Sequence, residues 1–170
     1  MLVGAACSLR RMERLWAPWR MTYIGGERPD GCVFCAQAAQ SDEDALIVHR
    51  GERCFAVLNL YPYGSGHLMI VPFRHVAAPA DLDADERIEF WELLAQALDA
   101  TAAALGAQGH NVGFNLGKAA GAGIEDHLHL HVVPRWIGDV NFMPVLADVR
   151  VIPEFLEETR RKLAEVWPDA

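Results

Sequence analysis

The chain has 170 residues, a length that fits a single domain with a sizeable hydrophobic core. Its hydrophobic fraction of 52% and charged fraction of 22% are typical of a globular protein, not of a disordered one. The net charge of −8 argues against a broad nucleic-acid-binding surface, which would be basic. No apolar run approaches membrane-spanning length, so we expect a cytoplasmic protein without a membrane partner.

The N-terminal segment, residues 1–29, is predicted to be a tail followed by an aromatic flap. Residues 1–14 show no periodicity, whereas residues 15–24 are dense in aromatic side chains for a chain terminus. The interpretation we favour is a flap that covers the edge of the core. In the alternative, an aromatic ring stacks on a nucleotide base while a cation faces the phosphate. The residues concerned are Trp16, Trp19, Tyr23 and Arg20.

The domain proper is predicted at 30–140, because glycine and proline residues punctuate the chain just before it. A short helix at 33–40 comes first. Three apolar runs separated by turn residues then predict strands that form an antiparallel meander. These strands are predicted at 45–49, 53–60 and 67–72.

A long helix is predicted next. Asp83 and Glu86 have the spacing of an N-cap and its capping partner, and Gly106 follows the last apolar position. The spacing predicts that the apolar stripe of this helix consists of Ile88, Trp91, Leu94, Leu98 and Leu105.

The remaining elements complete an α+β fold. A strand at 110–116 and a glycine-rich loop lead to a strand of histidines at 127–133. The extension at 141–170 contains a second helix at 153–167, in which acidic residues precede basic ones as the helix dipole favours. We therefore predict about five antiparallel strands, one long helix and a C-terminal helix.

Three histidines alternate with apolar residues in the segment 127–133. His127, His129 and His131 recur at every second position, which is the period of a strand with one polar and one apolar face. Their rings are therefore expected on one side, roughly 6–7 Å apart at the rise of a strand. Imidazole exchanges protons near neutral pH and attacks electrophiles. A half-buried strand has no structural use for three such rings, so the pattern predicts a site for a phosphate-sized group.

The four cysteines do not form the disulfide scaffold of a small secreted domain. Cys32 and Cys35 have the spacing of metal ligands, and a tetrahedral zinc site would need two more donors from elsewhere in the chain. The alternative is a pair of reduced cysteines packed in the core. Cys7 and Cys54 are interpreted as incidental.

The alternating histidines resemble the signature of the histidine triad family of nucleotide hydrolases and transferases. The similarity covers about residues 30–140 and includes His67, the segment 71–75, and Asn115 before the glycine-rich loop. The flanking segments resemble the bacterial diadenosine tetraphosphate phosphorylase branch of that family. These segments are 15–20, 59–63, 131–136 and 141–142.

The resemblance implies covalent chemistry on a nucleotide. His129 would be the nucleophile that attacks an α-phosphorus, with a backbone carbonyl orienting its other ring nitrogen. His131 would donate a hydrogen bond to phosphoryl oxygens, and His67 would support the site from a neighbouring strand. With His127, the first member of the triad, these are the implied catalytic residues. Phosphate or water would then attack the nucleotidyl-histidine and release ADP or AMP.

The resemblance also implies residues that bind the substrate, namely Asn59, Asn115, Gly121 and Gly123. Asn115 would lie beside the ribose or phosphate, and the glycine turn would offer backbone N–H groups to an oxyanion. A merely flexible connection stays open as the alternative for that turn. Residues 123–126 stand where better-known members have glutamine, serine or threonine. Glu125 or Asp126 could instead position a proton or a metal-bound leaving phosphate.

Cofactors and partners follow from the resemblance as well. In zinc-bearing relatives, histidines in the positions of His75 and His127 join the cysteine pair, which implies a closed site of Cys32, Cys35, His75 and His127. A divalent cation could accompany the substrate. The ligand would be an adenine nucleotide or a dinucleoside polyphosphate, and the protein would be a homodimer.

Three functions are therefore open. The favoured one is phosphorolysis of diadenosine tetraphosphate to ADP and ATP. A hydrolase would instead release AMP from dinucleoside polyphosphates or nucleoside phosphoramidates. From another class, a zinc-stabilised nucleotide-binding or sensing module would bind without turnover, which the missing hydroxyl or amide donor in the loop favours.

Overall fold

The computed structural model describes residues 31–139 and 154–168. The predicted tail and flap at 1–29, including Trp16, Trp19, Tyr23 and Arg20, lie outside the described residues, as does Cys7. The domain boundaries at 30 and 140 stay predictions. No helix in the two described ranges combines the length and apolar composition that a membrane crossing needs.

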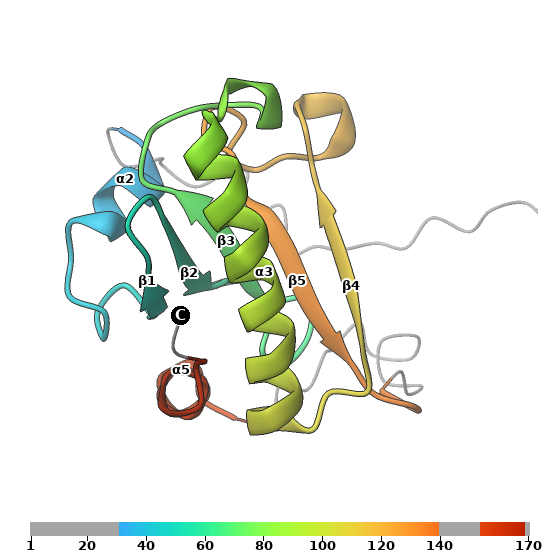
Figure 1. The fold of residues 1–170 in the computed structure, drawn as a ribbon. Coiled ribbons are helices and arrows are strands. Elements are labelled where there is room, and N and C mark those ends of the chain that lie inside the picture. Colours follow the sequence, from blue (N-terminus) through green and yellow to red (C-terminus); the bar gives the residue numbers. More distant parts are fainter. Residues whose placement is uncertain (1–30, 140–153, 169–170) are drawn as a thin grey trace, which may run out of the picture.

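An antiparallel five-stranded sheet forms the centre of the fold (Figure 1). In sheet order the strands are β1 (Ile47–Arg50), β2 (Cys54–Leu58), β3 (Leu68–Pro72), β5 (Leu130–Arg135) and β4 (Gly109–Phe114). The predicted α+β class is confirmed, and β1 to β3 form the predicted meander. β5, however, lies between β3 and β4. Almost every residue of β5 is buried and β4 is half exposed, so the more apolar strand takes the interior position.

The long helix α3 (Ala84–Leu105) crosses one face of the sheet (Figure 1). Its capping box is present as predicted: the Glu86 amide donates to the Asp83 carboxylate at 2.9 Å, and the Asp83 amide donates to Glu86 at 2.8 Å. Gly106 ends the helix in the left-handed conformation at φ +64°, which glycine adopts without steric cost.

The predicted apolar stripe of α3 is wrong at two positions. Ile88 and Trp91 are 59% and 57% exposed, whereas Leu94 is buried and Leu98 and Leu105 pack at the edge of the core. The sheet faces the side of α3 that carries Glu86, whose buried carboxylate forms an ion pair with Arg74. Residues spaced by three and four from that position therefore form the buried face. They are Phe90, Leu93, Leu94, Ala97 and Ala100.

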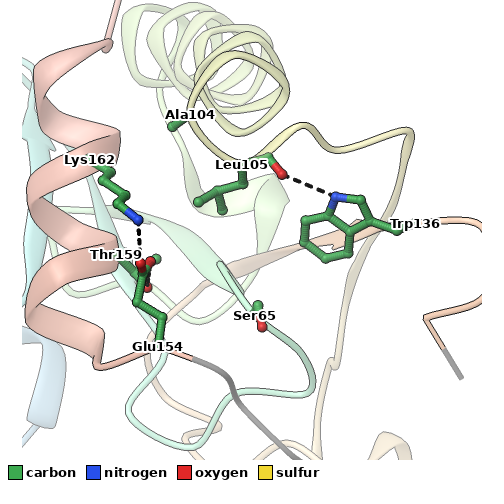
Figure 2. A pocket seen from close by; sticks show the side chains of 7 residues that line it. All are labelled: Ser65, Ala104, Leu105, Trp136, Glu154, Thr159 and Lys162. Atoms are coloured by element: carbon green, nitrogen blue, oxygen red, sulfur yellow. Dashed lines mark hydrogen bonds and ion pairs between the residues drawn. The ribbon is translucent and has the colours of Figure 1, made fainter. Parts of the chain in front are cut away.

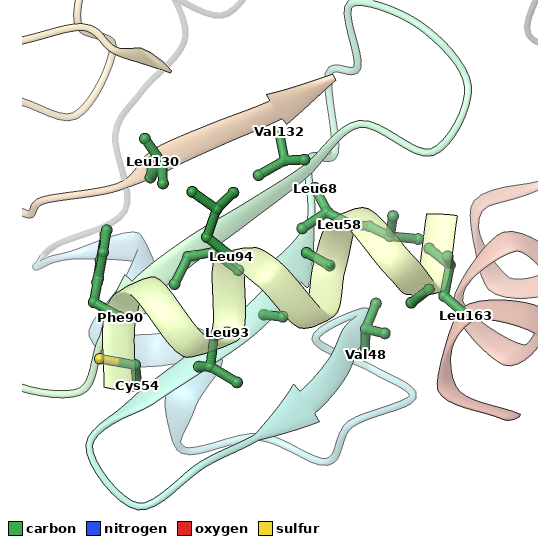
Figure 3. Close-up of a cluster of buried hydrophobic side chains, with 14 of the residues drawn as sticks. Val48, Cys54, Leu58, Leu68, Phe90, Leu93, Leu94, Leu130, Val132 and Leu163 are labelled. Carbon is green, nitrogen blue, oxygen red and sulfur yellow. The ribbon is translucent and has the colours of Figure 1, made fainter. Parts of the chain in front are cut away.

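Both faces of the sheet carry a core. The larger cluster lies between the sheet and α3, where Leu130 and Val132 of β5 meet Phe90 and Leu94 (Figure 3). On the opposite face, Phe34 of the short helix α2 (Val33–Ala38) packs in a second cluster with residues of β1, β2 and β3. The members of this second cluster are Phe34, Ala45, Ile47, Phe55, Val57, Met69 and Val71.

The C-terminal helix α5 (Leu156–Glu165) is shorter than the predicted 153–167, and Pro153 lies outside the described residues. Leu163 and Trp167 join the larger cluster. The Trp167 ring stacks on His49 with 5.3 Å between centroids, and its indole N–H donates to Gln96. The helix therefore ends just before Trp167, whose side chain contacts β1 and α3.

Replacing the buried ring of α3 tests which helix face packs on the sheet. We expect Phe90→Ala to lower the free energy of unfolding by about 3–5 kcal/mol, because it leaves a cavity beside Phe114. Trp91→Ala, a matched control on the exposed side, should change it by less than about 1 kcal/mol. Urea denaturation would measure both, and equal losses would contradict the assignment of the faces.

Candidate functional site

The histidine segment is only partly a strand. β5 begins at Leu130, so the predicted strand at 127–133 is wrong for its first residues. Continuing the register of β3 and β5 would set Leu128 opposite Pro72, which has no N–H to donate, and the Leu128 amide bonds the Val76 carbonyl instead. Successive side chains from His127 to Val132 nevertheless still point to alternate faces of the sheet.

The three triad rings lie on the face opposite α3. Leu128 joins Leu130 and Val132 in the larger cluster. The Phe34 ring on the other side lies 5.4 Å from His127 and 5.0 Å from His129, measured between centroids. His129 and His131 follow at 5.0 Å, edge to face. The structure therefore gathers the rings over α2 and the second cluster.

His129 presents one ring nitrogen with a lone pair. Its Nδ1 lies 2.8 Å from the backbone carbonyl oxygen of His127, and because a carbonyl only accepts, Nδ1 carries the hydrogen. Nε2 of the neutral ring is then unprotonated. Burial lowers the pKa of His129, against the opposing effect of this hydrogen bond. The lowered pKa favours a neutral ring, whose Nε2 keeps a lone pair and could act as a nucleophile.

His131 is the end of a short hydrogen-bond relay. The backbone N–H of Tyr63 donates to His67 Nδ1 at 3.0 Å, so the hydrogen of neutral His67 sits on Nε2. Nε2 donates in turn to His131 Nδ1 at 3.0 Å. His131 therefore carries its own hydrogen on Nε2, 3.1 Å from the carboxamide of Asn115. Because His131 Nε2–H needs an acceptor, the side-chain oxygen of Asn115, and not its NH2 group, is assigned to face the ring.

His67 is buried deeply enough to stay neutral at any physiological pH. Burial, followed by the charges of His131 and His129, lowers the pKa of His67 to about 3. A neutral His67 donates through one nitrogen and accepts through the other, which the relay requires. The direction of the relay is thus determined by a backbone amide and not by ambient pH.

This pKa has a consequence for stability in acid. The unfolded chain takes up a proton at His67 near pH 6.5, whereas the folded chain does so only near pH 3, so stability falls as pH drops through that window. The uptake of this one proton lowers the free energy of unfolding by up to about 1.4 kcal/mol per pH unit. We expect His67→Gln to show a shallower pH dependence than the unmodified protein in urea titrations from pH 6.5 to 4. Parallel curves would contradict this.

Two cysteines and two histidines meet beside the triad. The potential ligand atoms of Cys32, Cys35, His75 and His127 all lie within 4.8 Å of one another. Cys32 Sγ is 3.1 Å from His127 Nδ1, and Cys35 Sγ is 3.4 Å from His75 Nδ1. Ligand atoms of a tetrahedral zinc site are about 3.6 Å apart, so the cluster has the dimensions of a metal site.

The donor chemistry of this cluster also suits a cation. His127 Nε2 donates to the Pro72 carbonyl at 2.8 Å, which leaves the lone pair of Nδ1 facing the sulfurs. Desolvation, then the hydrogen bond and charge of Cys32, raise the pKa of Cys35. A cation between the two sulfurs would favour the thiolate form that these effects disfavour. These four residues could hold a metal, and the carbonyl of the same His127 orients His129.

The predicted substrate-binding residues lie on two loops. Asn59 follows β2, where its side-chain oxygen accepts from the Tyr61 amide at 2.9 Å. Asn115 follows β4 and contacts His131. Gly121 has φ +81°, which explains glycine there, and Gly123 is half buried in the turn that returns to His127.

Sequence reasoning missed three residues that shape the site. Phe34 packs under two triad rings, Tyr63 sets the tautomer of His67 through its backbone amide, and Pro72 offers the carbonyl that His127 needs. Phe34 lies inside the cysteine motif and could have been found there. The other two act through their backbone, which no side-chain pattern reveals.

A cavity of about 430 Å³ lies elsewhere, between the end of α3 and α5 (Figure 2). Its lining includes Leu105, Trp136 and Lys162, and none of the triad histidines. Several polar groups on its wall are paired with one another: Glu154 accepts from both Lys162 and Thr159, and Trp136 donates to the Leu105 carbonyl.

Comparison with protein families places this site in a known class. The model of the HIT domain matches residues 40–136, and the chain belongs to that family. The AP-4-A phosphorylase of Mycobacterium tuberculosis is 42% identical over 166 residues, which cover 92% of this chain and 85% of that protein.

Two solved structures are similar in fold. A Zn-bound histidine triad family protein from Mycobacterium smegmatis superposes with a TM-score of 0.65 at 27% identity, covering 81% of this chain and 93% of that one. A uridylyltransferase superposes with the same TM-score at 16% identity, covering 89% of this chain and 49% of that one. The second likeness concerns the fold alone.

Proposed function

We propose that this protein cleaves diadenosine tetraphosphate by phosphorolysis, through a nucleotide covalently bound to His129. The observation that carries the proposal is the tautomer of His129, whose Nδ1–H is donated to the His127 carbonyl so that Nε2 keeps its lone pair. The name of the M. tuberculosis relative, AP-4-A phosphorylase, supports the choice of substrate and reaction.

The reaction would proceed in two displacements at one phosphorus. In the first, His129 Nε2 bonds to the α-phosphorus while the P–O bond to the departing ATP breaks, and ATP leaves with the electron pair. In the second, an oxygen of inorganic phosphate bonds to the same phosphorus while the P–N bond breaks. ADP is released and the electron pair returns to Nε2, so the products are ATP and ADP.

The other predicted site residues receive roles consistent with their places. His131 Nε2–H, directed by His67, would donate to the phosphoryl oxygens as negative charge develops. Asn115 lies beside that nitrogen and would bind the ribose or phosphate of the adenine nucleotide. Asn59 and the turn around Gly121 and Gly123 would complete the nucleotide site. Together these residues would bind the ligand and hold the reacting atoms in line.

We further propose that zinc occupies the cluster of Cys32, Cys35, His75 and His127. The zinc in the M. smegmatis structure and the spacing of the donor atoms support this identity. When bound, zinc would supply a structural cross-link between α2 and the segment before His129. A second divalent cation, carried by the substrate, would neutralise part of the polyphosphate charge.

Two properties beyond the site complete the proposal. We propose a homodimer that pairs through β4, because β4 forms one edge of the sheet while β1 at the other edge already contacts α5. We also propose a cytoplasmic location, where adenine nucleotides are plentiful and cysteine pairs stay reduced. Sedimentation measurements would test the dimer.

Product analysis tests the function. The purified protein is incubated with diadenosine tetraphosphate, with and without inorganic phosphate, and the nucleotides are separated by chromatography. We expect ADP and ATP in equal amounts, formed only when phosphate is present. AMP formation independent of phosphate would indicate a hydrolase, and tight binding without any product would indicate a binding module.

A further inference from the structure

The loop between Asn115 and the triad contains one side chain that can donate a hydrogen bond. Residues 117–126 read Gly-Lys-Ala-Ala-Gly-Ala-Gly-Ile-Glu-Asp, in which Lys118 has the one side chain with an N–H or O–H donor when the carboxylates are ionised. It is also one of only two lysines among the 15 basic residues of the chain. An anion that enters the site from this loop therefore meets Lys118 or backbone amides.

The loop runs along the side of the sheet that carries the histidines. It begins just after Asn115, which contacts His131, and it ends at His127. Ile124 packs against the second cluster, whose Phe34 contacts two triad rings. Lys118 Nζ lies 3.7 Å from Glu125 Oε1, and Glu125 is two residues before His127.

Lys118 is loosely held compared with other cations in the described part of the chain. Its side chain is 85% exposed, and the contact to Glu125 is long for an ion pair. Arg50, Arg74 and Arg135, in contrast, each make two or more guanidinium hydrogen bonds to carboxylates or carbonyls. An exposed lysine pair of this kind exchanges its partner readily.

We propose that Lys118 binds the inorganic phosphate that attacks the nucleotidyl-histidine. This inference rests on the proposed function. In a protein with a net charge of −8, a dianion needs a local cation to approach a phosphorus that already carries negative charge. Glu125 holds the ammonium group while the phosphate site is empty, and phosphate displaces it. Lys118 is thus the residue that favours phosphate over water in the second displacement.

Steady-state kinetics of Lys118→Met tests the proposal, with inorganic phosphate as the varied substrate at saturating diadenosine tetraphosphate. We expect KM for phosphate to rise at least about tenfold, as the loss of one charge-assisted hydrogen bond implies. KM for the dinucleotide should change less than about twofold. Lys118→Arg should recover most of the phosphate affinity, and Glu125→Gln should lower KM for phosphate.

The matched control removes a charge of the same sign far from the site. Arg161→Met, on the exposed side of α5, should leave KM for phosphate unchanged. If Lys118→Met and Arg161→Met behave alike while the unmodified protein still requires phosphate, the role of Lys118 is refuted and the proposed function stands. If the unmodified protein forms AMP whether or not phosphate is present, both fail.

Discussion

Replacing His129 by glycine is expected to lower kcat by at least about 10⁴-fold, because it removes the ring nitrogen whose lone pair would bond to phosphorus. The ring lies between Phe34 and His131, and its only backbone bond is to the preceding histidine. Its removal therefore leaves the sheet pairing unchanged. Discontinuous assays of ATP release, with a circular dichroism spectrum of the variant, would measure both effects.

A second measurement separates loss of the nucleophile from general damage. After quenching in alkaline denaturant, which preserves a P–N bond, unmodified protein incubated without phosphate and with diadenosine tetraphosphate labelled in the adenylyl group should retain label, whereas His129→Gly should retain none. His49→Gln is a suitable control, since His49 is also a partly buried histidine but stacks on Trp167 at the other end of the sheet. Near-normal turnover by His129→Gly would refute the assignment of the nucleophile.

Removal of a cysteine ligand is expected to have the largest effect on stability. Cys35→Ser should abolish metal binding and lower the free energy of unfolding by roughly 3–5 kcal/mol, because the metal ion would no longer link α2 to His127. The carbonyl of His127 also orients His129, so turnover should fall roughly 10–100-fold. Metal content by mass spectrometry and thermal unfolding with and without a chelator would measure the change.

Cys54 provides the matched control for this experiment. It is buried in the larger cluster, and burial together with the charges of Glu89 and Glu86 raises its pKa to about 12, so it stays a neutral thiol. Cys54→Ala should therefore retain one metal ion per chain and the response to chelator. Equal metal content in Cys35→Ser and the unmodified protein would rule out the cluster as the binding site.

Residue type and spacing were sufficient to predict the features of the candidate site that lie close together in the chain, whereas His67, His75 and Asn115 were expected only from the family resemblance. The alternation at His127, His129 and His131 required only the period of an extended chain, and extended geometry is a local property. The capping box of α3 was predictable for the same reason, because Asp83 and Glu86 satisfy each other within one turn. Cys32 and Cys35 likewise lie within one helical turn, and they were predicted as a pair.

Contacts between distant segments were not predictable from local pattern. Ile88 and Trp91 fit the apolar spacing of a helix as well as Phe90 and Leu93 do, and only the position of the sheet selects the second set. The position of β5 between β3 and β4 likewise depends on how strands from distant parts of the chain pair, which no single segment reveals.

The sequence by itself determined the groups that stand close together along the chain: three alternating imidazoles, a cysteine pair and a glycine-rich loop, each built from neighbouring residues. A backbone carbonyl that orients His129 was expected, and the structure identifies it as that of His127, two residues away. Only the tertiary structure decided which nitrogen of His131 carries the hydrogen, because that depends on His67 and on a backbone amide at Tyr63 far along the chain. A ring nitrogen takes its hydrogen according to the partner it meets, and that partner exists only after folding.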